Sequence, residues 1–462
     1  MTKKMTRRTA LKYIGGGVLG LAGITTLFKR KDILAFLDAD QRASQSNQGG
    51  SGAAVDTRLY RSSGQQLSLL GFGAMRFPTQ VINGEKVIDE ELSEKMIDYA
   101  YRHGVNYFDT AYMYHKGKSE EFLGRVLKKY PRDSYILADK MPGFELDSPA
   151  RAKEVFQEQL DRCGVEYFDN YFLHYLNKRE DFDRFYLQQG VLDYLKEEKA
   201  RGRIRNLGFS YHGDVPFFEY LMDNFSWDCT LIQLNYQDWN EETETPEGTR
   251  IMGSLYRKAA EKGVPCFVME PVRGGRLASL PESAEKLLKE REPNRSIASW
   301  AIRFAASQPE VVTVLSGMSD LNQVVDNINT LSDFKPLSKT DQMVLQKANG
   351  NAVALQAVAC TYCRYCMPCP YGVDIPGNFK VYNDWAASLG FLDEDRKPSE
   401  KQKAEFLRHY RNSIEKSARA DHCIRCRKCL ELCPQHIDIP AEMRKIDTIV
   451  QDCLNASGRG KI

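Results

Sequence analysis

Eight of the twelve cysteines lie in two short runs, and their spacing indicates chemistry more directly than any other feature of the 462-residue chain. The runs contain Cys360, Cys363, Cys366, Cys369, Cys423, Cys426, Cys429 and Cys433. The second run, CIRCRKCLELCP, has the C-x2-C-x2-C-x3-C-P spacing of bacterial [4Fe-4S] ligands. The first, CTYCRYCMPCP, has one residue fewer before its last cysteine, so Cys369 fits least well. Both runs continue alike, in PYGVDIP and PQHIDIP, and this repeat predicts two [4Fe-4S] clusters.

Zinc and disulfides are the two alternatives for these cysteines. Four-cysteine zinc sites pair two C-x2-C units that a loop usually separates, and three consecutive C-x2-C steps fit that arrangement poorly. Cysteines two residues apart seldom bridge comfortably, and eight of them would mispair readily. The spacing therefore favours iron–sulfur clusters over both.

Four polar residues form a second candidate site. Asp109, Lys140 and His174 fall at the ends of predicted strands, and Tyr114 follows five residues after Asp109. A tyrosine hydroxyl is a poor acid at neutral pH, because its ordinary pKa is about 10. The ammonium of Lys140 would stabilise the phenolate, Asp109 would keep that ammonium in place, and His174 would orient a substrate carbonyl. Each residue alone could be a cap, a solvated charge or a core residue, but together they predict an acid–base site.

The elements that position these residues alternate between strands and helices from residue 58 to about 335. Strands are predicted at 107–112, 134–140, 168–174, 205–210, 229–236, 265–270 and 311–317. Helical periodicity lies between them, for example over 90–104 and 190–202. The alternation predicts an α/β fold, a (β/α)8 TIM barrel, with its chemistry at the C-terminal strand ends. A doubly wound sheet is the alternative, but no G-x-G-x-x-G follows an early strand.

The segments FDTAYMYHKGKSEEFLG, ILADK and DNYFLH resemble the aldo-keto reductase family. The resemblance continues through RIRNLGFSYHG, QLNYQDWN, VMEPVRGGRL and VLSGMSDLNQVVDNI, and covers nearly all of residues 58–335. It implies that Asp109, Tyr114, Lys140 and His174 are the family's catalytic tetrad. It also implies hydride transfer between a nicotinamide, NAD(H) or NADP(H), and a carbonyl or alcohol, with Tyr114 as general acid or base.

The same resemblance implies which residues bind the nicotinamide cofactor. They are Ser210, Gln233, Pro271, Gly274, Ser316, Gly317, Met318, Gln323 and Asn327. Met269 stands where the family often stacks a tyrosine on the nicotinamide, and Gly317 and Gln323 stand where members that prefer NADPH carry a lysine and an arginine. A 2′-phosphate would lack charged partners there, so NAD and NADP both stay open, with Arg273 and Arg276 as other partners for the phosphates.

Fifty-three residues separate Cys369 from Cys423, and they are predicted to be helical over 376–392 and 399–420. This spacing resembles the mainly α-helical ferredoxin modules that are fused to other oxidoreductases. The whole chain resembles aldo-keto reductases with a C-terminal 4Fe-4S domain.

The combination allows three functions, because a nicotinamide passes two electrons as a hydride whereas a [4Fe-4S] cluster passes one at a time. The clusters could connect the barrel to a redox partner protein, they could be structural, or the chain could be an electron carrier with the barrel as scaffold. The intact tetrad argues against the third function, and the paired cysteine repeats favour the first.

The start of the chain predicts a targeting signal. TRRTALK, with Arg7 and Arg8, resembles the twin-arginine export signal, and an apolar stretch over 13–28 follows it. We expect export by the twin-arginine machinery to the periplasm or to a membrane anchor facing it, and a cytoplasmic protein if the signal is unused. The expected parts are a signal or anchor at 1–31, a flexible linker at 32–57, the barrel at 58–335, a helical connection at 336–358 and the 4Fe-4S domain at 359–462.

Composition excludes little else. The net charge of +2 and the scattered basic residues give no case for nucleic acid as a partner. The expected partner is a small carbonyl or alcohol substrate, selected by loops over 211–220 and 237–250. Aromatic residues near the expected barrel mouth could stack on a sugar or could pack in the barrel; they are Tyr112, Tyr175, Tyr211, Tyr236 and Trp239.

Overall fold

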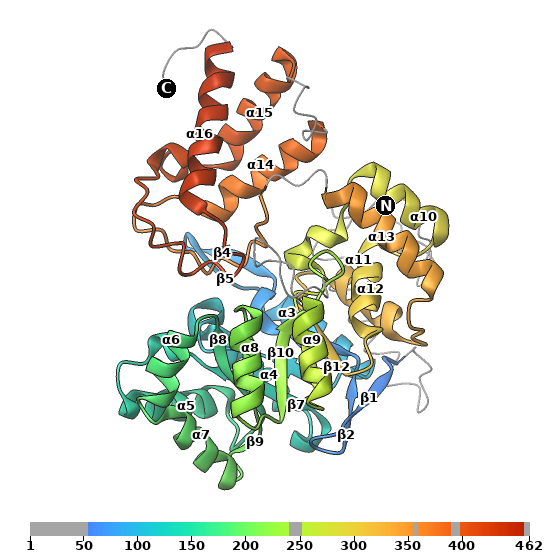
Figure 1. Cartoon of the computed structure of the whole chain (residues 1–462), viewed down its shortest axis with the longest axis vertical. Coiled ribbons are helices and arrows are strands. Elements are labelled where there is room, and N and C mark those ends of the chain that lie inside the picture. The colour runs from blue at the N-terminus through green and yellow to red at the C-terminus, as the bar shows by residue number, and fades with distance from the viewer. Residues whose placement is uncertain (1–53, 240–251, 354–357, 390–397, 457–462) are drawn as a thin grey trace, which may run out of the picture. The chain divides into compact units, whose positions relative to one another are not determined.

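The computed structural model describes residues 54–239, 252–353, 358–389 and 398–456, and the chain divides into two compact units (Figure 1). The first unit extends to Val272 and includes Glu292–Gln342. The second comprises Arg273–Arg291 and the chain from Met343 onward. The predicted signal, most of the predicted linker and most of the predicted 237–250 loop lie outside the described residues. No helix in the described ranges has the length and apolar character needed to cross a membrane.

The first unit is a closed barrel of eight parallel strands, which confirms the predicted (β/α)8 fold. Its strands, in chain order, are β3 (Leu70–Gly73), β6 (Tyr107–Asp109), β7 (Ile136–Met141), β8 (Phe168–Leu176), β9 (Ile204–Tyr211), β10 (Cys229–Gln233), β11 (Cys266–Met269) and β12 (Val311–Ser316). Each strand pairs with the next, and β12 closes the barrel on β3. The predicted strands correspond to seven of these, and β3 was missed.

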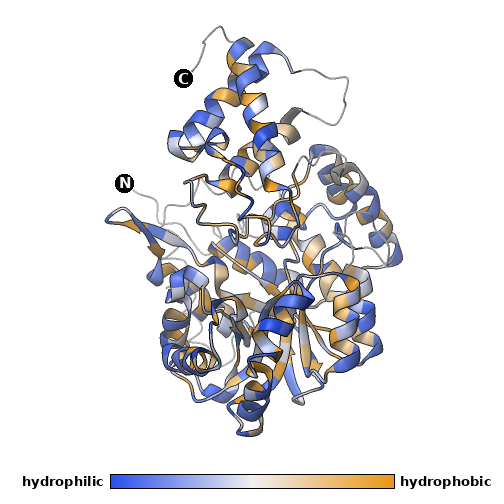
Figure 2. Cartoon of the chain, turned by 60° about the vertical axis from the view of Figure 1, so that its left-hand side comes forward, coloured by the Kyte–Doolittle hydropathy of each residue, from blue (hydrophilic) through white to orange (hydrophobic). Residues whose placement is uncertain are grey.

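Helices surround the barrel strands and turn their apolar faces inward (Figure 2). The main ones are α3 (Glu90–Arg102), α4 (Lys118–Leu127), α5 (Pro149–Cys163), α7 (Val191–Ala200), α8 (Val215–Asn224), α9 (Met252–Glu261), α11 (Ile297–Ala306) and α12 (Leu321–Leu331). Their ends follow from sequence signals. The Ser148 side chain caps the start of α5 by accepting a hydrogen bond from Arg151 N, Pro149 opens the helix, and Gly164 ends it at φ 62°.

Two antiparallel hairpins accompany the barrel: β1 (Thr57–Tyr60) with β2 (Gln65–Ser68), and β4 (Thr79–Ile82) with β5 (Glu85–Ile88). The first hairpin buries Tyr60 against Phe267, with ring centroids 5.3 Å apart, among the apolar residues inside the barrel. The barrel therefore has a packed interior, which leaves the strand ends for chemistry.

The second unit is mainly helical. It contains α10 (Glu282–Arg291), α14 (Ile375–Leu389), α15 (Glu400–Ser413) and α16 (Ile439–Ala456), and α13 (Lys339–Val353) leads into it. The apolar faces of α14, α15 and α16 form its core, in which Trp385 stacks on Phe406 at 4.2 Å between ring centroids. Asp374 and Asp438, the aspartates of the two DIP repeats, accept hydrogen bonds from Gly377 N and Ala441 N at the starts of α14 and α16. The sequence repeat is thus a structural repeat.

Candidate active site and cysteine cavity

A buried ion pair joins the ends of two neighbouring barrel strands. Parallel pairing of β6 with β7 places Asp109 beside the chain that carries Lys140. Lys140 Nζ donates to Asp109 Oδ1 at 2.6 Å and to the carbonyl of Thr110 at 2.5 Å. Only 2% of the lysine side chain and 5% of the aspartate side chain are exposed. Burial raises the pKa of Asp109, and the charge of Lys140 opposes that rise. An ammonium has three donors, so one remains for a further group.

Tyr114 and His174 lie next to this pair. Tyr114 opens the turn that follows β6, and its ring centroid is 5.2 Å from Lys140 Nζ. The rings of Tyr114 and His174 are 6.4 Å apart and nearly perpendicular. His115 and Lys116, directly after Tyr114, both have positive φ, a strained conformation for residues with a Cβ that is often found at functional sites. The four residues predicted for the acid–base site are therefore neighbours in the structure.

His174 is neutral in this environment. Burial lowers the pKa of its imidazole well below the usual value, and the charges of Lys140 and His212 lower it further. A neutral imidazole can donate one hydrogen bond to a substrate oxygen without adding a charge to the site. Phe144, which the sequence analysis missed, lies 5.7 Å from the His174 ring and is 39% exposed. Its only sequence signal is its place in the segment that follows Lys140.

A buried network that the sequence analysis also missed holds the backbone of Lys140. Asp139 Oδ1 accepts a hydrogen bond from Lys140 N at 2.8 Å, and Gln159 Nε2 donates to the Lys140 carbonyl at 3.1 Å. Gln159 Nε2 also lies 3.0 Å from Glu120 Oε1, which accepts from it, and Arg162 pairs with the same carboxyl group. Burial raises the pKa of Asp139 well above its usual value, and the nearby Glu120 charge raises it further.

Two of the predicted nicotinamide contacts are buried on neighbouring strands. Ser210, on β9, accepts a hydrogen bond from Tyr175 N at 2.8 Å. Gln233 ends β10 and is 4% exposed, yet its Nε2 has no hydrogen-bond partner among the described residues. A buried amide donor without a partner is uncommon and suits a site that a ligand amide completes. This observation fits a nicotinamide.

The predicted adenosine-binding stretch begins where β12 ends. Asn327 Nδ2 donates to Ser316 Oγ at 2.9 Å, and Gln323 Oε1 accepts from Ser319 N at 2.8 Å. Met318 is buried, and a Cβ at Gly317 would lie only 3.2 Å from the Arg76 side chain. The stretch thus comprises the C-terminal end of β12, a short loop and the first turns of α12, at the barrel end where such enzymes often bind phosphates.

Pro271 and Gly274 fall in different units. Pro271 is buried in the first unit, whereas Gly274 belongs to the second, where a Cβ would lie 1.9 Å from the Thr361 carbonyl oxygen. Arg273 and Arg276, expected near cofactor phosphates, also belong to the second unit. There Arg276 donates to the carbonyls of Val358 and Cys360, so it holds the start of the first cysteine run.

Most of the aromatic residues expected near the barrel mouth pack on other residues of the first unit, one of the two roles that the sequence left open. Tyr112 hydrogen-bonds Glu158, and Tyr211 donates to the carbonyl of Asp214. Tyr236 and Trp239 both pack on Phe304. Tyr175 lies apart from this packing: its ring contacts those of Phe144 and His212. Tyr175 and Phe144 thus join Tyr114 as aromatic residues near His174.

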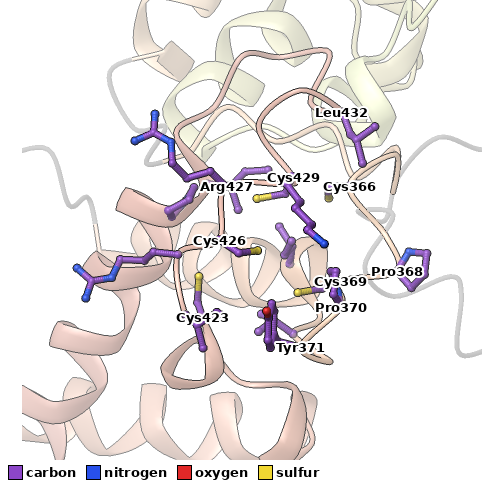
Figure 3. A pocket seen from close by; sticks show the side chains of 17 residues that line it. Cys366, Pro368, Cys369, Pro370, Tyr371, Cys423, Cys426, Arg427, Cys429 and Leu432 are labelled. Atoms are coloured by element: carbon purple, nitrogen blue, oxygen red, sulfur yellow. The ribbon is translucent and has the colours of Figure 1, made fainter. Parts of the chain in front are cut away.

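The two cysteine runs meet in the second unit around a cavity of about 170 Å³ (Figure 3). The sulfur atoms of Cys369, Cys423, Cys426 and Cys429 surround this space, and we call these four residues the outer set. Burial and the charges of the other three members together raise the pKa of the Cys429 thiol to about 11. Cys369, whose spacing was irregular, therefore lies with the three leading cysteines of the other run.

The remaining four cysteines form what we call the inner set, Cys360, Cys363, Cys366 and Cys433. Burial raises the pKa of the Cys366 thiol, the neighbouring Cys363, Cys360 and Cys433 raise it further, and Cys429 of the outer set also raises it. Cys360 and Cys433 are buried in the core of the unit. Each set thus combines three cysteines of one run with the last cysteine of the other, which is how two-cluster ferredoxins share their ligands.

The backbone of the two runs is also the same. Tyr362 and Arg364 flank Cys363 with φ of 57° and 69°, and Arg425 and Arg427 flank Cys426 with φ of 60° and 65°. Such turns direct backbone N–H groups towards an anion, as at many iron–sulfur sites. Tyr362 N already donates to the Cys360 sulfur at 3.3 Å.

The arrangement of the cysteines around a cavity suits a cluster. In the described parts of the chain, no three Cys, His, Asp or Glu side chains converge on a position for one metal ion. A [4Fe-4S] cluster spreads its irons over a cube, so its ligands surround a volume, as these cysteines do. All eight cysteines of the two runs are free of disulfides.

Comparison with known proteins identifies the class. Residues 69–349, more than half of the chain, match the aldo/keto reductase family, and the chain therefore belongs to that family. It is an oxidoreductase of this type. Residues 359–438 match the 4Fe-4S dicluster domain, so the enzyme carries a C-terminal iron–sulfur domain.

Individual relatives cover the barrel. L-galactose dehydrogenase of Arabidopsis thaliana is 26% identical over 315 residues, which are 63% of this chain and 93% of the relative. Versiconal hemiacetal acetate reductase of Aspergillus parasiticus is 40% identical over 300 residues, 59% of this chain and 78% of the relative. An aldo-keto reductase from Bacillus halodurans in its holo form superposes with a TM-score of 0.52 at 25% identity, over 64% of this chain and 96% of that one.

Proposed function

We propose that the barrel transfers a hydride between a nicotinamide and a carbonyl or alcohol, and that two [4Fe-4S] clusters pass electrons singly to or from a partner protein. The observation that carries the first part is the buried Lys140–Asp109 pair beside Tyr114. The observation that supports the second is the sharing of cysteines between the two runs.

The protein groups would divide the acid–base work as follows. A bound reduced nicotinamide supplies the hydride. Tyr114 donates a proton to the carbonyl oxygen, and Lys140 stabilises the phenolate that remains. Asp109 keeps the ammonium charged and oriented. Neutral His174 donates a hydrogen bond to the same oxygen and fixes its position.

The nicotinamide would lie where Ser210 and the unpartnered Gln233 amide can reach its carboxamide, with Ser316, Gly317, Met318, Gln323 and Asn327 towards the adenosine. Pro271, in the same unit, belongs to the same proposed set. A hydroxylated, sugar-like carbonyl or alcohol suits the aromatic pair Phe144 and Tyr175, which could stack on such a ring. One relative of this barrel is a galactose dehydrogenase by name, which supports that substrate class.

One observation favours structural clusters as the second candidate. Cys360 and Cys433 lie in the apolar core of the second unit, where a cluster could serve mainly to hold the helices together. The barrel would then act alone as a nicotinamide-dependent reductase. The electron-carrier function, with the barrel as scaffold, has the assembled Tyr114 site against it.

The deciding experiment is anaerobic. The protein with its clusters is treated with dithionite, with NADH or with NADPH, and visible and paramagnetic resonance spectra are recorded. Reduction of the clusters by NADH or by NADPH would support electron transfer between the barrel site and the clusters, and would identify which of the two cofactors the protein uses. Tyr114→Phe should lower carbonyl reduction by about 10²–10⁴-fold while iron content and the dithionite-reduced spectrum stay unchanged. Clusters that dithionite reduces and that neither nicotinamide nor substrate alcohol reduces would contradict the electron-transfer part.

We also propose export by the twin-arginine machinery, with the protein folded, cluster-loaded and carrying a tightly bound nicotinamide. The basis is the TRRTALK segment. Changing Arg7 and Arg8 to lysine should retain the protein in the cytoplasm, as judged by fractionation. Denaturing the exported protein should release a nicotinamide, and its absence would contradict the carried cofactor.

A further inference from the structure

The outer cysteine set is the more accessible of the two. Cys426 is exposed, and Cys369, Cys423 and Cys429 are partly exposed. In the inner set, Cys360 and Cys433 are buried. Cys366 belongs to the inner set and also lines the cavity of the outer set, so the two sets are adjacent. An electron held in this unit would therefore leave or enter through the outer set.

The charges around the outer set have one sign. Three charged residues line its cavity, Arg425, Arg427 and Lys428, and all three are basic and exposed. None of them forms an ion pair within the described ranges of the chain. The acidic residues of the same segment, Asp421 and Glu431, do not line the cavity. Because the whole chain carries a net charge of only +2, this cluster of charge is local.

Apolar side chains are exposed between these charges. Ile424 is 58% exposed, and Tyr371 and Leu432 are each 46% exposed. All three line the same cavity, although exposed large apolar residues are few elsewhere in the described structure. Exposed apolar groups rimmed by charge are typical of protein-binding sites, with the apolar groups contributing affinity and the charges steering association.

We infer that this face of the outer set is the docking surface for a small acidic redox protein. The occupant is defined by charge complementarity with Arg425, Arg427 and Lys428, and by an apolar patch that meets Ile424, Tyr371 and Leu432. The inference rests on the proposed electron-transfer function and adds its site and the partner's chemistry. A reduced [4Fe-4S] cluster held by the outer set would give up one electron, and the partner would gain it, with no bond made or broken.

The test uses two haem proteins of opposite charge as probes, acidic cytochrome b5 and basic cytochrome c. The full-length protein with its clusters is reduced with dithionite, freed of excess reductant and mixed with either oxidised probe by stopped flow. We expect the second-order rate constant with cytochrome b5 to fall as salt rises, because salt screens the attraction. The rate constant with cytochrome c should rise with salt, because the same surface repels it.

The variant Arg425→Glu/Arg427→Glu/Lys428→Glu should lower the cytochrome b5 rate constant about 10-fold or more at low salt and raise that of cytochrome c. The matched control, Lys401→Glu/Arg408→Glu/Lys416→Glu, makes the same change in net charge at exposed positions on or near α15. It should leave both rate constants within about twofold of wild type. Iron content and the spectrum of the reduced protein verify that each variant holds its clusters.

Calorimetric titration of the oxidised proteins gives a readout without electron transfer. Cytochrome b5 should bind the wild-type protein with an affinity that falls as salt rises. Its affinity for the charge-reversed variant should be lower by about 10-fold or more. Ile424→Ser should weaken binding without changing its salt dependence. The docking surface would be overturned if the two triple variants changed the rate constants and the affinity equally. It would also be overturned if cytochrome b5 showed no salt-dependent binding to the wild-type protein. Failure of dithionite to reduce the clusters would instead contradict the proposed function.

Discussion

At the scale of single residues, the most consequential contact is the ion pair between Lys140 and Asp109. Removing one partner of a buried pair leaves the other charge without compensation, and this typically costs about 3–5 kcal/mol. We therefore expect Lys140→Met to lower the free energy of unfolding of the barrel by about that amount, measured by denaturant titration. Lys140→Met/Asp109→Asn removes both charges and should recover part of the loss. A double variant no more stable than the single one would contradict this account.

The carboxyl pair Asp139 and Glu120 predicts a dependence of stability on pH. Because burial raises the pKa of Asp139, the folded protein keeps a proton that the unfolded chain releases near pH 4. This proton contributes fully to the free energy of unfolding below about pH 4. Its contribution falls as the pH rises from there towards the raised pKa of Asp139 in the folded state. Asp139→Asn still accepts from Lys140 N but has no proton to lose.

The measurement is the melting temperature of the barrel between about pH 5 and pH 8, where wild type should lose stability through this pair and Asp139→Asn should lose less. Asp161→Asn, an exposed aspartate on α5, is the control and should follow wild type. Identical slopes for Asp139→Asn and wild type would contradict the raised pKa of Asp139 in the folded protein.

At the scale of elements, the sharing of cysteines between runs makes a prediction that spacing alone does not. Cys369→Ser should remove the same cluster as Cys426→Ser, and Cys433→Ser the same cluster as Cys363→Ser. Each variant should keep roughly half of the iron, as one of two clusters remains. Paramagnetic resonance of the reduced variants would show which signal persists. Matching spectra for Cys369→Ser and Cys363→Ser would show that each run builds its own cluster.

The sequence predicted most of the barrel and left one strand out. Seven strands have β-branched and aromatic runs, whereas β3 reads LGFG, and glycine is a poor strand former. Its glycine is needed because a Cβ at Gly71 would lie 2.5 Å from the Leu315 side chain. The tetrad could be predicted because Asp109, Lys140 and His174 lie in recognisable strands and Tyr114 follows shortly after one of them.

Other parts of the sites depend on packing between distant segments, which spacing does not encode. Gln159, on α5, supports Lys140 through a contact that only the packing of helix on strand creates. Arg276 was expected near a phosphate and instead holds the first cysteine run, 82 and 84 residues further along the chain. Neither position carries a local signal of its role.

At the scale of the whole molecule, the two units have separate cores, so we expect two thermal transitions. The cysteines contribute to the core of the second unit, and clusters that bind the folded form stabilise it. Anaerobic removal of iron with a chelator should abolish or strongly lower the transition of the second unit. The melting temperature of the barrel should change by no more than about 2 °C when iron is removed, because the barrel core contains none of the eight cysteines. Calorimetry measures both transitions. A single transition that shifts as a whole would contradict two units that unfold independently.

The pairing of Cys433 with 360–366 also has a consequence for biosynthesis. When the first run leaves the ribosome, it presents four cysteines, of which only three belong to the same proposed cluster. The inner set lacks Cys433, and the outer set lacks Cys423, Cys426 and Cys429, until the second run has been made. Cluster insertion would therefore be a late event that follows translation of both runs, and a cell short of iron would accumulate chains with a finished barrel and an unfilled second unit.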